Sequence, residues 1–191
     1  MSTRVMIIPE DPTLDKHILK PIIERLFDDL GYGSAQVYVL EDPHMGGVEQ
    51  ALDAETIAGI VQDRPMFQLF LLLVDRDCME HRASLIAQRE AAHPSKLIAC
   101  LAVQEVEVWM LALHREALGS GWAEVRSECH PKERYADPLL KERKWTTKLG
   151  RGRVEAMRSL GGKWQGLLQV CPELAELKQR IADWLKTRAE A

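Results

Sequence analysis

Three short apolar runs of this chain each end in acidic residues. If these runs are neighbouring parallel strands, their carboxyl ends meet at one edge of the sheet, where α/β folds bind their ligands. Carboxylates gathered there repel one another, so a cation is needed to hold them. The pattern therefore predicts a divalent-metal site with hard oxygen ligands, suited to Mg²⁺ or Mn²⁺. The clusters are Glu10 with Asp11 after residues 5–8, Asp75 with Asp77 after residues 69–74, and Glu105 with Glu107 after residues 97–103.

Chain geometry limits which of these carboxylates can share a site. Asp75 and Asp77 are two residues apart in an extended chain, so both side chains point the same way. Glu105 and Glu107 would lie about 200° apart on a helix, so both can face the site only if the helix starts between them. Two Mg²⁺ or Mn²⁺ ions bound by these carboxylates can activate a water and stabilise the leaving oxygen of a phosphodiester. A structural role also fits, because acids at the start of a helix favour its dipole.

Strand-like and helix-like patterns alternate up to residue 120, which is typical of an α/β fold with a mostly parallel, four-stranded sheet flanked by helices. We expect residues 1–120 to form this domain and residues 121–191 to form a basic loop and a helical C-terminal extension packed on it. Pro21 implies a kinked helix, or one that starts near Lys20. The expected strands are 5–8, 36–40, 69–74 and 97–103, and the expected helices are 15–30, 48–61, 83–92, 104–118 and one opened by Pro172.

The composition is that of a globular chain without a membrane span. Its 191 residues are 46% hydrophobic, and no apolar stretch approaches the length of a span. The N-terminus lacks the features of a signal peptide, which predicts a cytoplasmic protein. The four cysteines are scattered without a paired short spacing, in agreement with that location. Cys129 and His130 could contribute to a metal site, or form a loop that shares no ligand, and His130 is a candidate general base by residue type.

Positive charge is concentrated in one segment of an otherwise acidic chain. Residues 1–129 hold 11 Lys and Arg against 21 Asp and Glu, whereas residues 130–163 hold 10 against 4. This asymmetry predicts a polyanionic partner, or a basic surface that packs against the acidic body or is simply solvated. If the partner is a nucleic acid, we expect DNA rather than RNA. Tyr135 and Trp145 could stack on bases, and the glycines of 150–153 could bring the backbone close to a phosphate. The candidate nucleic-acid-binding residues are Lys132, Arg134, Lys144, Lys148, Arg151 and Arg153.

The order of these elements and acids resembles the Toprim layout of topoisomerases, primases and the OLD-family nucleases that work with ATPases in phage defence. Toprim domains share a Glu after the first strand and an Asp-x-Asp after the third, here Glu10 and Asp75 with Asp77. The segment 104–112 is similar to the Glu-x-Glu-x-Trp helix of a bacterial family of uncharacterised Toprim-like proteins associated with defence. Segments 130–135 and 171–174 also resemble that family, so the resemblance covers most of the chain.

The resemblance implies a Toprim-like, Rossmann-like sheet with a metal site at its edge. Toprim chains usually place Gly directly after the first Glu and Asp four residues on. Here Asp11 follows Glu10 and Asp15 lies four residues after Asp11, so either Glu10 or Asp11 takes the position of the Glu. Toprim-like nucleases also use a Lys from outside the acidic core, for which Lys148 or Lys132 is the candidate. The candidate metal ligands are Glu10, Asp11, Asp15, Asp75, Asp77 and Glu107, and the candidate catalytic residues are Glu10, Asp11, Asp75, Asp77, Glu105, Glu107 and Lys148.

The favoured hypothesis is a metal-dependent nuclease that hydrolyses nucleic-acid phosphodiesters, with an ATPase partner in phage defence. A rival from another class is a catalytically degenerate Toprim-like module that binds or regulates a partner protein. A third hypothesis is an α/β enzyme that processes nucleotides or small ligands with the same acids. A homo-oligomer is compatible with each of them.

Overall fold

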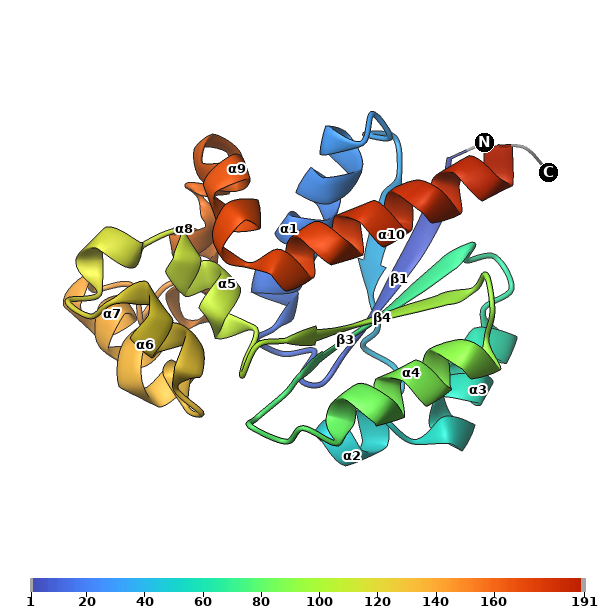
Figure 1. Cartoon of the computed structure of the whole chain (residues 1–191), viewed down its shortest axis with the longest axis horizontal. Coiled ribbons are helices and arrows are strands. Elements are labelled where there is room, and N and C mark those ends of the chain that lie inside the picture. Colours follow the sequence, from blue (N-terminus) through green and yellow to red (C-terminus); the bar gives the residue numbers. More distant parts are fainter. Residues whose placement is uncertain (1, 190–191) are drawn as a thin grey trace.

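The structure is a computed structural model that describes residues 2–189, and its centre is one sheet of four parallel strands. The strand order is β2-β1-β3-β4 (Figure 1), so the sheet has the all-parallel α/β architecture expected from the alternating pattern. The strands are β1 (Arg4–Pro9), β2 (Gln36–Val39), β3 (Leu69–Asp75) and β4 (Leu97–Ala102). Each predicted strand is confirmed with bounds that differ by one residue at most.

Alternate residues of each strand face two separate hydrophobic cores. In β1, Val5 and Ile7 belong to one core, whereas Met6 and Ile8 belong to the other. This alternation follows from the two-residue period of a strand. All residues of 69–74 are buried, because β3 is a central strand that helices cover on both faces.

Helices cover the two faces of the sheet (Figure 1). One face carries α1 (Lys16–Asp29), α9 (Leu160–Val170) and α10 (Pro172–Ala189). The other face carries the helices that connect β2 to β3 and β3 to β4, which are α2 (Val48–Ala51), α3 (Ala54–Asp63) and α4 (Arg82–Ala92). None of the helices in residues 2–189 combines the length and apolar character that crossing a membrane would require.

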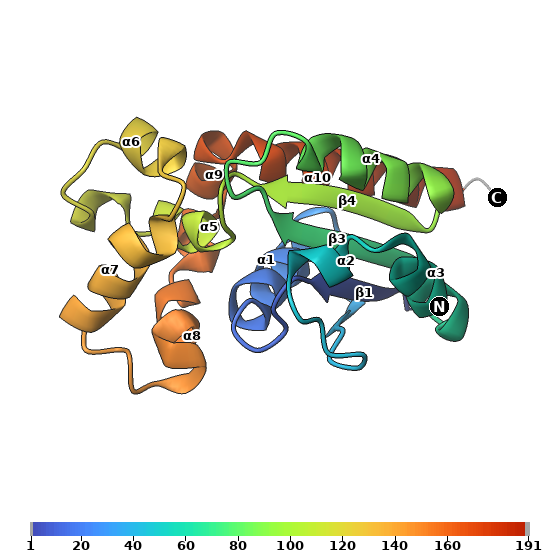
Figure 2. The ribbon, with the colours of Figure 1, turned by 90° about the horizontal axis from the view of Figure 1, so that it is seen from below.

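A group of short helices lies beyond the carboxyl ends of the strands (Figure 2). This position places the predicted basic segment next to the acidic edge of the sheet. The elements are α5 (Glu107–Ala112), η1 (Arg115–Ala117), α6 (Trp122–Ser127), η2 (Lys132–Ala136), α7 (Asp137–Glu142), η3 (Leu149–Gly152) and α8 (Arg153–Met157).

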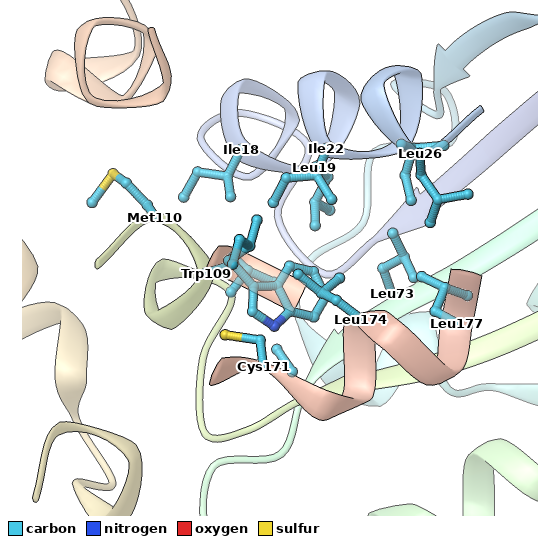
Figure 3. Packing of buried hydrophobic residues seen from close by; sticks show 14 of the residues in the cluster. Ile18, Leu19, Ile22, Leu26, Leu73, Trp109, Met110, Cys171, Leu174 and Leu177 are labelled. Carbon is cyan, nitrogen blue, oxygen red and sulfur yellow. The ribbon is translucent and has the colours of Figure 1, made fainter. Parts of the chain in front are cut away.

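Trp109 of α5 joins the sheet, α1 and α10 into one core (Figure 3). Its indole is fully buried, and its Nε1 donates a hydrogen bond to Glu173 Oε1 at 2.8 Å. Arg126 Nη1 and Nη2 donate to the two oxygens of the same Glu173 carboxylate at 2.6 and 2.9 Å. The start of α10 is thereby fixed to α5 and α6, which keeps the helical region in place over the carboxyl edge.

Three predicted helices differ from the observed ones. The helix expected over 104–118 starts later, because Gln104 has a positive φ of 68° and cannot be helical, and it is divided into α5 and the separate 3-10 turn η1. The helix expected over 48–61 is split, because Asp53 caps α3 by accepting a hydrogen bond from the Thr56 N–H. The alternative that α1 starts near Lys20 is wrong: α1 begins at Lys16, and Pro21 lies inside it.

Candidate functional site

Four of the predicted acids meet at the carboxyl edge of the sheet, and we call Glu10, Asp15, Asp75 and Glu107 the carboxylate cluster. Glu10 and Asp75 leave neighbouring strands, since β1 and β3 pair up to Pro9 and Leu73. Asp15 directly precedes α1, and Glu107 begins α5. The carboxylates of Glu107, Asp15 and Glu10 all lie close enough to raise the pKa of Asp75.

Burial, with added repulsion from nearby carboxylates, raises the pKa values of Asp75, Asp15 and Glu10. Burial raises the pKa of Asp75 well above its usual range, and the carboxylates of Glu107, Asp15 and Glu10 raise it further. The pKa of Asp15 is raised to about 7, mainly by burial and then by Glu107. Burial followed by Asp77 raises the pKa of Glu10, whose Oε2 is buried without a hydrogen-bond partner. A site of this kind favours either protons or a bound cation.

Backbone donors compensate only part of this charge. The Val106 N–H donates to Asp75 Oδ1 at 2.9 Å, and the Asp11 N–H donates to Asp15 Oδ2 at 3.1 Å. Within residues 2–189, Glu107 is the only member of the cluster that forms an ion pair with a basic side chain. The carboxylates of Glu10, Asp15 and Asp75 therefore repel one another when they are ionised, because no basic side chain within residues 2–189 pairs with them.

Arg153 is the cation that lies against the cluster. Its Nη2 donates to Glu107 Oε1 at 2.5 Å, and the two side chains are only 1% and 3% exposed. The predicted nucleic-acid-binding role of Arg153 does not fit this position, because the guanidinium is buried rather than on the basic surface.

Two glycines allow the chain to deliver Arg153 to this place. Gly150 and Gly152 have φ values of 61° and 93°. A Cβ on Gly150 would lie 2.4 Å from His17 Cδ2, and one on Gly152 would lie 2.8 Å from Trp145 Cβ. The glycines thus serve close packing against the protein itself, where the sequence had suggested close approach to a phosphate.

Asp77 and Asp11, the remaining acids of the first two clusters, form hydrogen bonds with residues that are near them in the sequence. Asp77 Oδ2 accepts a hydrogen bond from Arg82 Nη1 at 2.6 Å, and the same nitrogen donates to the Asp75 carbonyl. Asp11 Oδ1 accepts from the Thr13 N–H at 2.7 Å and so shapes the turn before α1. Asp77 still acts on the site electrostatically, since it raises the pKa of Glu10.

Glu105 belongs to a second group of side chains, which we call the outer triad of Glu105, His130 and Glu133. One potential ligand atom from each residue lies within 4.8 Å of the others, so the triad could hold a metal ion. It is the single group of three or more His, Cys, Asp and Glu residues in 2–189 that meets this distance. The pKa of Glu105 is raised to about 7, mainly by burial, whereas the Lys132 N–H opposes the shift by donating to Oε2 at 2.8 Å.

Both glutamates after β4 are buried, which resolves the geometric problem posed by their spacing. Helix α5 starts at Glu107, with Val106 at its cap, so the helix does begin between them. Glu107 joins the carboxylate cluster and Glu105 joins the outer triad. The coulombic effect of Glu107 on the pKa of Glu105 shows that the two groups adjoin.

Two of the four cysteines are paired, although their spacing in the sequence gave no sign of a pair. Cys78 and Cys129 form a disulfide across 51 residues, with their Cα atoms 5.6 Å apart, whereas Cys100 and Cys171 are buried free thiols. The bond joins the loop that follows Asp77 to the loop that carries His130. Disulfides are rare in cytosolic proteins, so the cysteines no longer support the cytoplasmic expectation, which stays a prediction.

The basic segment divides into engaged and exposed side chains. Arg134 pairs with Glu124 and Glu128 and lies over the Tyr135 ring, which is itself buried. Trp145 is half-buried beside His114 and Gly152, so both aromatic rings are used in packing. Lys148, the predicted catalytic lysine, is exposed and forms no ion pair within residues 2–189. The exposed cations of the predicted binding set, besides Arg134, are Lys144, Lys148 and Arg151, and Lys132 is half-buried.

The acids of the cluster could be found from the sequence, but their partners could not. Arg153 lies 46 residues from Glu107, and the Cys78–Cys129 bond spans 51 residues. The one local signal for the outer triad was the spacing of His130 and Glu133, three residues apart in a segment that did not read as a helix. Comparisons with protein-family models, curated proteins and solved structures found no match for this chain.

We predict that the native protein has no thiol that reacts readily, and that mild reduction releases two. The reason is that Cys78 is exposed and Cys129 half-buried, whereas Cys100 and Cys171 are buried. Loss of the bond should lower the free energy of unfolding by about 2–4 kcal/mol, because the cross-link closes a long loop. Thiol titration and urea denaturation with and without a dithiol reductant measure both effects. Two reactive thiols before reduction would contradict the disulfide.

We predict that Asp15→Asn stabilises the metal-free protein increasingly as the pH rises from about 4 to about 7, and that the gain levels off above this range. The folded-state pKa of Asp15 is about 7 and its unfolded value is lower, so the folded protein binds more protons and wild-type stability is lost as the pH rises through 7. Burial lowers the pKa of His17 and His114, which act in the opposite direction in both proteins and cancel in the comparison. Urea denaturation in chelator measures the difference, and a gain that is constant with pH would refute the assignment.

We predict that Arg153→Met lowers the free energy of unfolding by about 3–5 kcal/mol, because the substitution leaves Glu107 buried without its partner. Arg158→Met is the matched control, since Arg158 forms an exposed pair with Glu155 and its loss should cost at most about 0.5 kcal/mol. Urea denaturation at pH 8 compares the two variants. Equal stabilities would show that the Glu107–Arg153 pair does not carry the charge balance of the cluster.

Proposed function

We propose that this protein is a divalent-metal-dependent phosphodiesterase that cleaves nucleic acid, DNA rather than RNA. The observation that carries the proposal is the carboxylate cluster, whose members come from two neighbouring strand ends and two helix starts, with Glu107, Asp15 and Glu10 close enough to raise the pKa of Asp75. The position at the carboxyl edge of a parallel sheet is where α/β enzymes bind their ligands. The resemblance of Glu10 and the Asp75-x-Asp77 segment to Toprim nucleases supports the same activity.

The carboxylates of the cluster offer oxygen ligands of the kind that Mg²⁺ or Mn²⁺ prefers. Glu10 Oε2 is buried with no hydrogen-bond partner, and Asp75 accepts a single hydrogen bond, on Oδ1. Mg²⁺ is usually bound through one or two carboxylates while it keeps several waters, so it does not need the close cage that Ca²⁺ or a structural metal needs. Glu10 and Asp75 would hold the ion, with Asp15 beside them. Such an ion supplies a Lewis acid for the scissile phosphate and lowers the pKa of water.

The protein's own residues would position the substrate and move protons. Exposed Lys144, Lys148 and Arg151 can contact backbone phosphates, which attract Lys and Arg irrespective of sequence. Arg153 holds Glu107 in place and keeps one positive charge beside the reacting group. Glu105, with a pKa of about 7, can take or give a proton near neutral pH. An ATPase partner in phage defence is a further part of the proposal that rests on the resemblance, and a homo-oligomer is compatible with it.

A non-catalytic binding module is the second candidate, and the Glu107–Arg153 pair favours it. A buried guanidinium neutralises one carboxylate of the cluster permanently. A degenerate site could keep its acids in this way without any metal. Binding of Mg²⁺ or Mn²⁺ separates the two candidates, because a degenerate module gains no stability from either ion.

We predict that the protein cleaves plasmid or single-stranded DNA in millimolar Mg²⁺ or Mn²⁺, and that Asp75→Asn lowers the rate at least about 100-fold. The asparagine can still accept the Val106 N–H, so the variant should fold and yet lose the charge that holds the ion. Asp63→Asn, an exposed change at the end of α3 that should leave the rate unchanged, is the matched control.

The same preparations distinguish the remaining functions. RNA and mononucleotides are tested beside DNA, since cleavage of mononucleotides alone would indicate a nucleotide-processing enzyme. If neither ion raises the melting temperature of the wild type and no substrate is cleaved, the nuclease proposal fails. The binding-module hypothesis would then stand.

A further inference from the structure

The outer triad has the construction of a metal site made by two chain segments. Glu105 lies between the end of β4 and the start of α5. His130 and Glu133 lie three residues apart on one helical turn, which His130 opens by accepting the Arg134 N–H at 3.1 Å. Residues at this spacing point to the same side of a helix. Their potential ligand atoms and that of Glu105 are within 4.8 Å of one another.

The surroundings leave these ligands available and hold them in place. Within residues 2–189, no basic side chain forms an ion pair with Glu105 or Glu133, because neighbouring Arg134 is held by Glu124 and Glu128. The Lys132 N–H donates to Glu105 Oε2 and so holds this carboxylate in place, and Glu105 offers a ligand atom within 4.8 Å of those of His130 and Glu133. Cys129 lies directly before His130 and is joined to Cys78 by the disulfide.

The loop on the other side of this disulfide is fixed to the same strand end. The Cys78 N–H donates to Gln104 Oε1 at 2.7 Å, and the Asp77 N–H donates to the Gln104 carbonyl at 3.0 Å. Gln104 directly precedes Glu105. The disulfide therefore connects the segment that carries His130 to the segment that carries Glu105, and it reduces the freedom of both ligands.

We propose that Glu105, His130 and Glu133 bind a first-row transition-metal dication, such as Zn²⁺, at a site separate from the carboxylate cluster. An imidazole combined with carboxylates suits Zn²⁺, Mn²⁺ or Fe²⁺, whereas Mg²⁺ prefers oxygen ligands alone. Three protein ligands leave at least one coordination position open for water or an anionic group, as in catalytic rather than structural zinc sites. The proposal concerns metal binding and does not require the proposed hydrolysis.

The test is a calorimetric titration in which Zn²⁺ is added to the oxidised protein. The buffer contains excess Mg²⁺ to occupy the carboxylate cluster, and the protein carries no transition metal at the start. We expect one Zn²⁺ to bind, and His130→Gln and Glu133→Gln each to weaken it at least about tenfold. His81→Gln, which removes another exposed histidine, and Asp75→Asn, which alters the cluster, should leave the affinity within about twofold.

Further readouts separate a coordination site from adventitious binding. X-ray absorption at the zinc edge should show one imidazole nitrogen among oxygen ligands, and that nitrogen should disappear in His130→Gln. The double variant Cys78→Ser, Cys129→Ser should bind Zn²⁺ more weakly than the oxidised wild type. The proposal is overturned if His130→Gln and Glu133→Gln bind Zn²⁺ as tightly as the wild type, or if His81→Gln weakens binding equally. Asp75→Asn should lose the rise in melting temperature that Mg²⁺ gives the wild type while it still binds Zn²⁺. Failure of the nuclease proposal would therefore be recognised separately from failure of the zinc proposal.

Discussion

The burial of carboxylates at the carboxyl edge of the sheet is the constraint on which the rest of this structure depends. A buried carboxylate is unfavourable unless it is protonated, hydrogen-bonded or paired with a cation. Asp75 and Asp15 each receive one backbone N–H, and Glu107 receives Arg153, but Glu10 Oε2 receives no partner. Burial, and after it the repulsion from neighbouring carboxylates, raises the pKa values of Glu10, Asp15 and Asp75. A fold stabilised for its own sake would place apolar residues at such positions.

The helical region beyond the sheet is built around this charge. Arg153 reaches Glu107 only because Gly150 and Gly152 adopt left-handed backbone conformations and pack against His17 and Trp145. The Cys78–Cys129 disulfide holds a second part of the same region over the loop after Asp77. Glu173, at the start of α10, binds both Trp109 and Arg126 and so fixes α5 and α6. Three separate connections thus place the basic segment against the acidic edge.

Local sequence pattern predicted the sheet and the acids, because both depend on short-range properties. The run 69–74 is apolar throughout, which a central parallel strand requires, and the acids follow such runs directly. The helix expected over 104–118 was wrong because Gln104 makes two hydrogen bonds to the Asp77 loop in a conformation that no helix allows. The partners Arg153, Cys129 and His130 could not be predicted, because their positions depend on how distant segments pack rather than on their neighbours in sequence.

The two groups of ligands differ in a way that bears on how the site works. The carboxylate cluster offers oxygen alone, and Arg153 supplies it with one charge that never dissociates, so the cluster can persist without a metal. The outer triad offers an imidazole at an exposed edge, and within residues 2–189 no basic side chain forms an ion pair with its carboxylates. Glu107 belongs to the carboxylate cluster and Glu105 to the outer triad, and the two residues lie on either side of the start of α5. One helix start thus supplies a carboxylate to each group, which is why the two groups adjoin although their ligand atoms differ in kind.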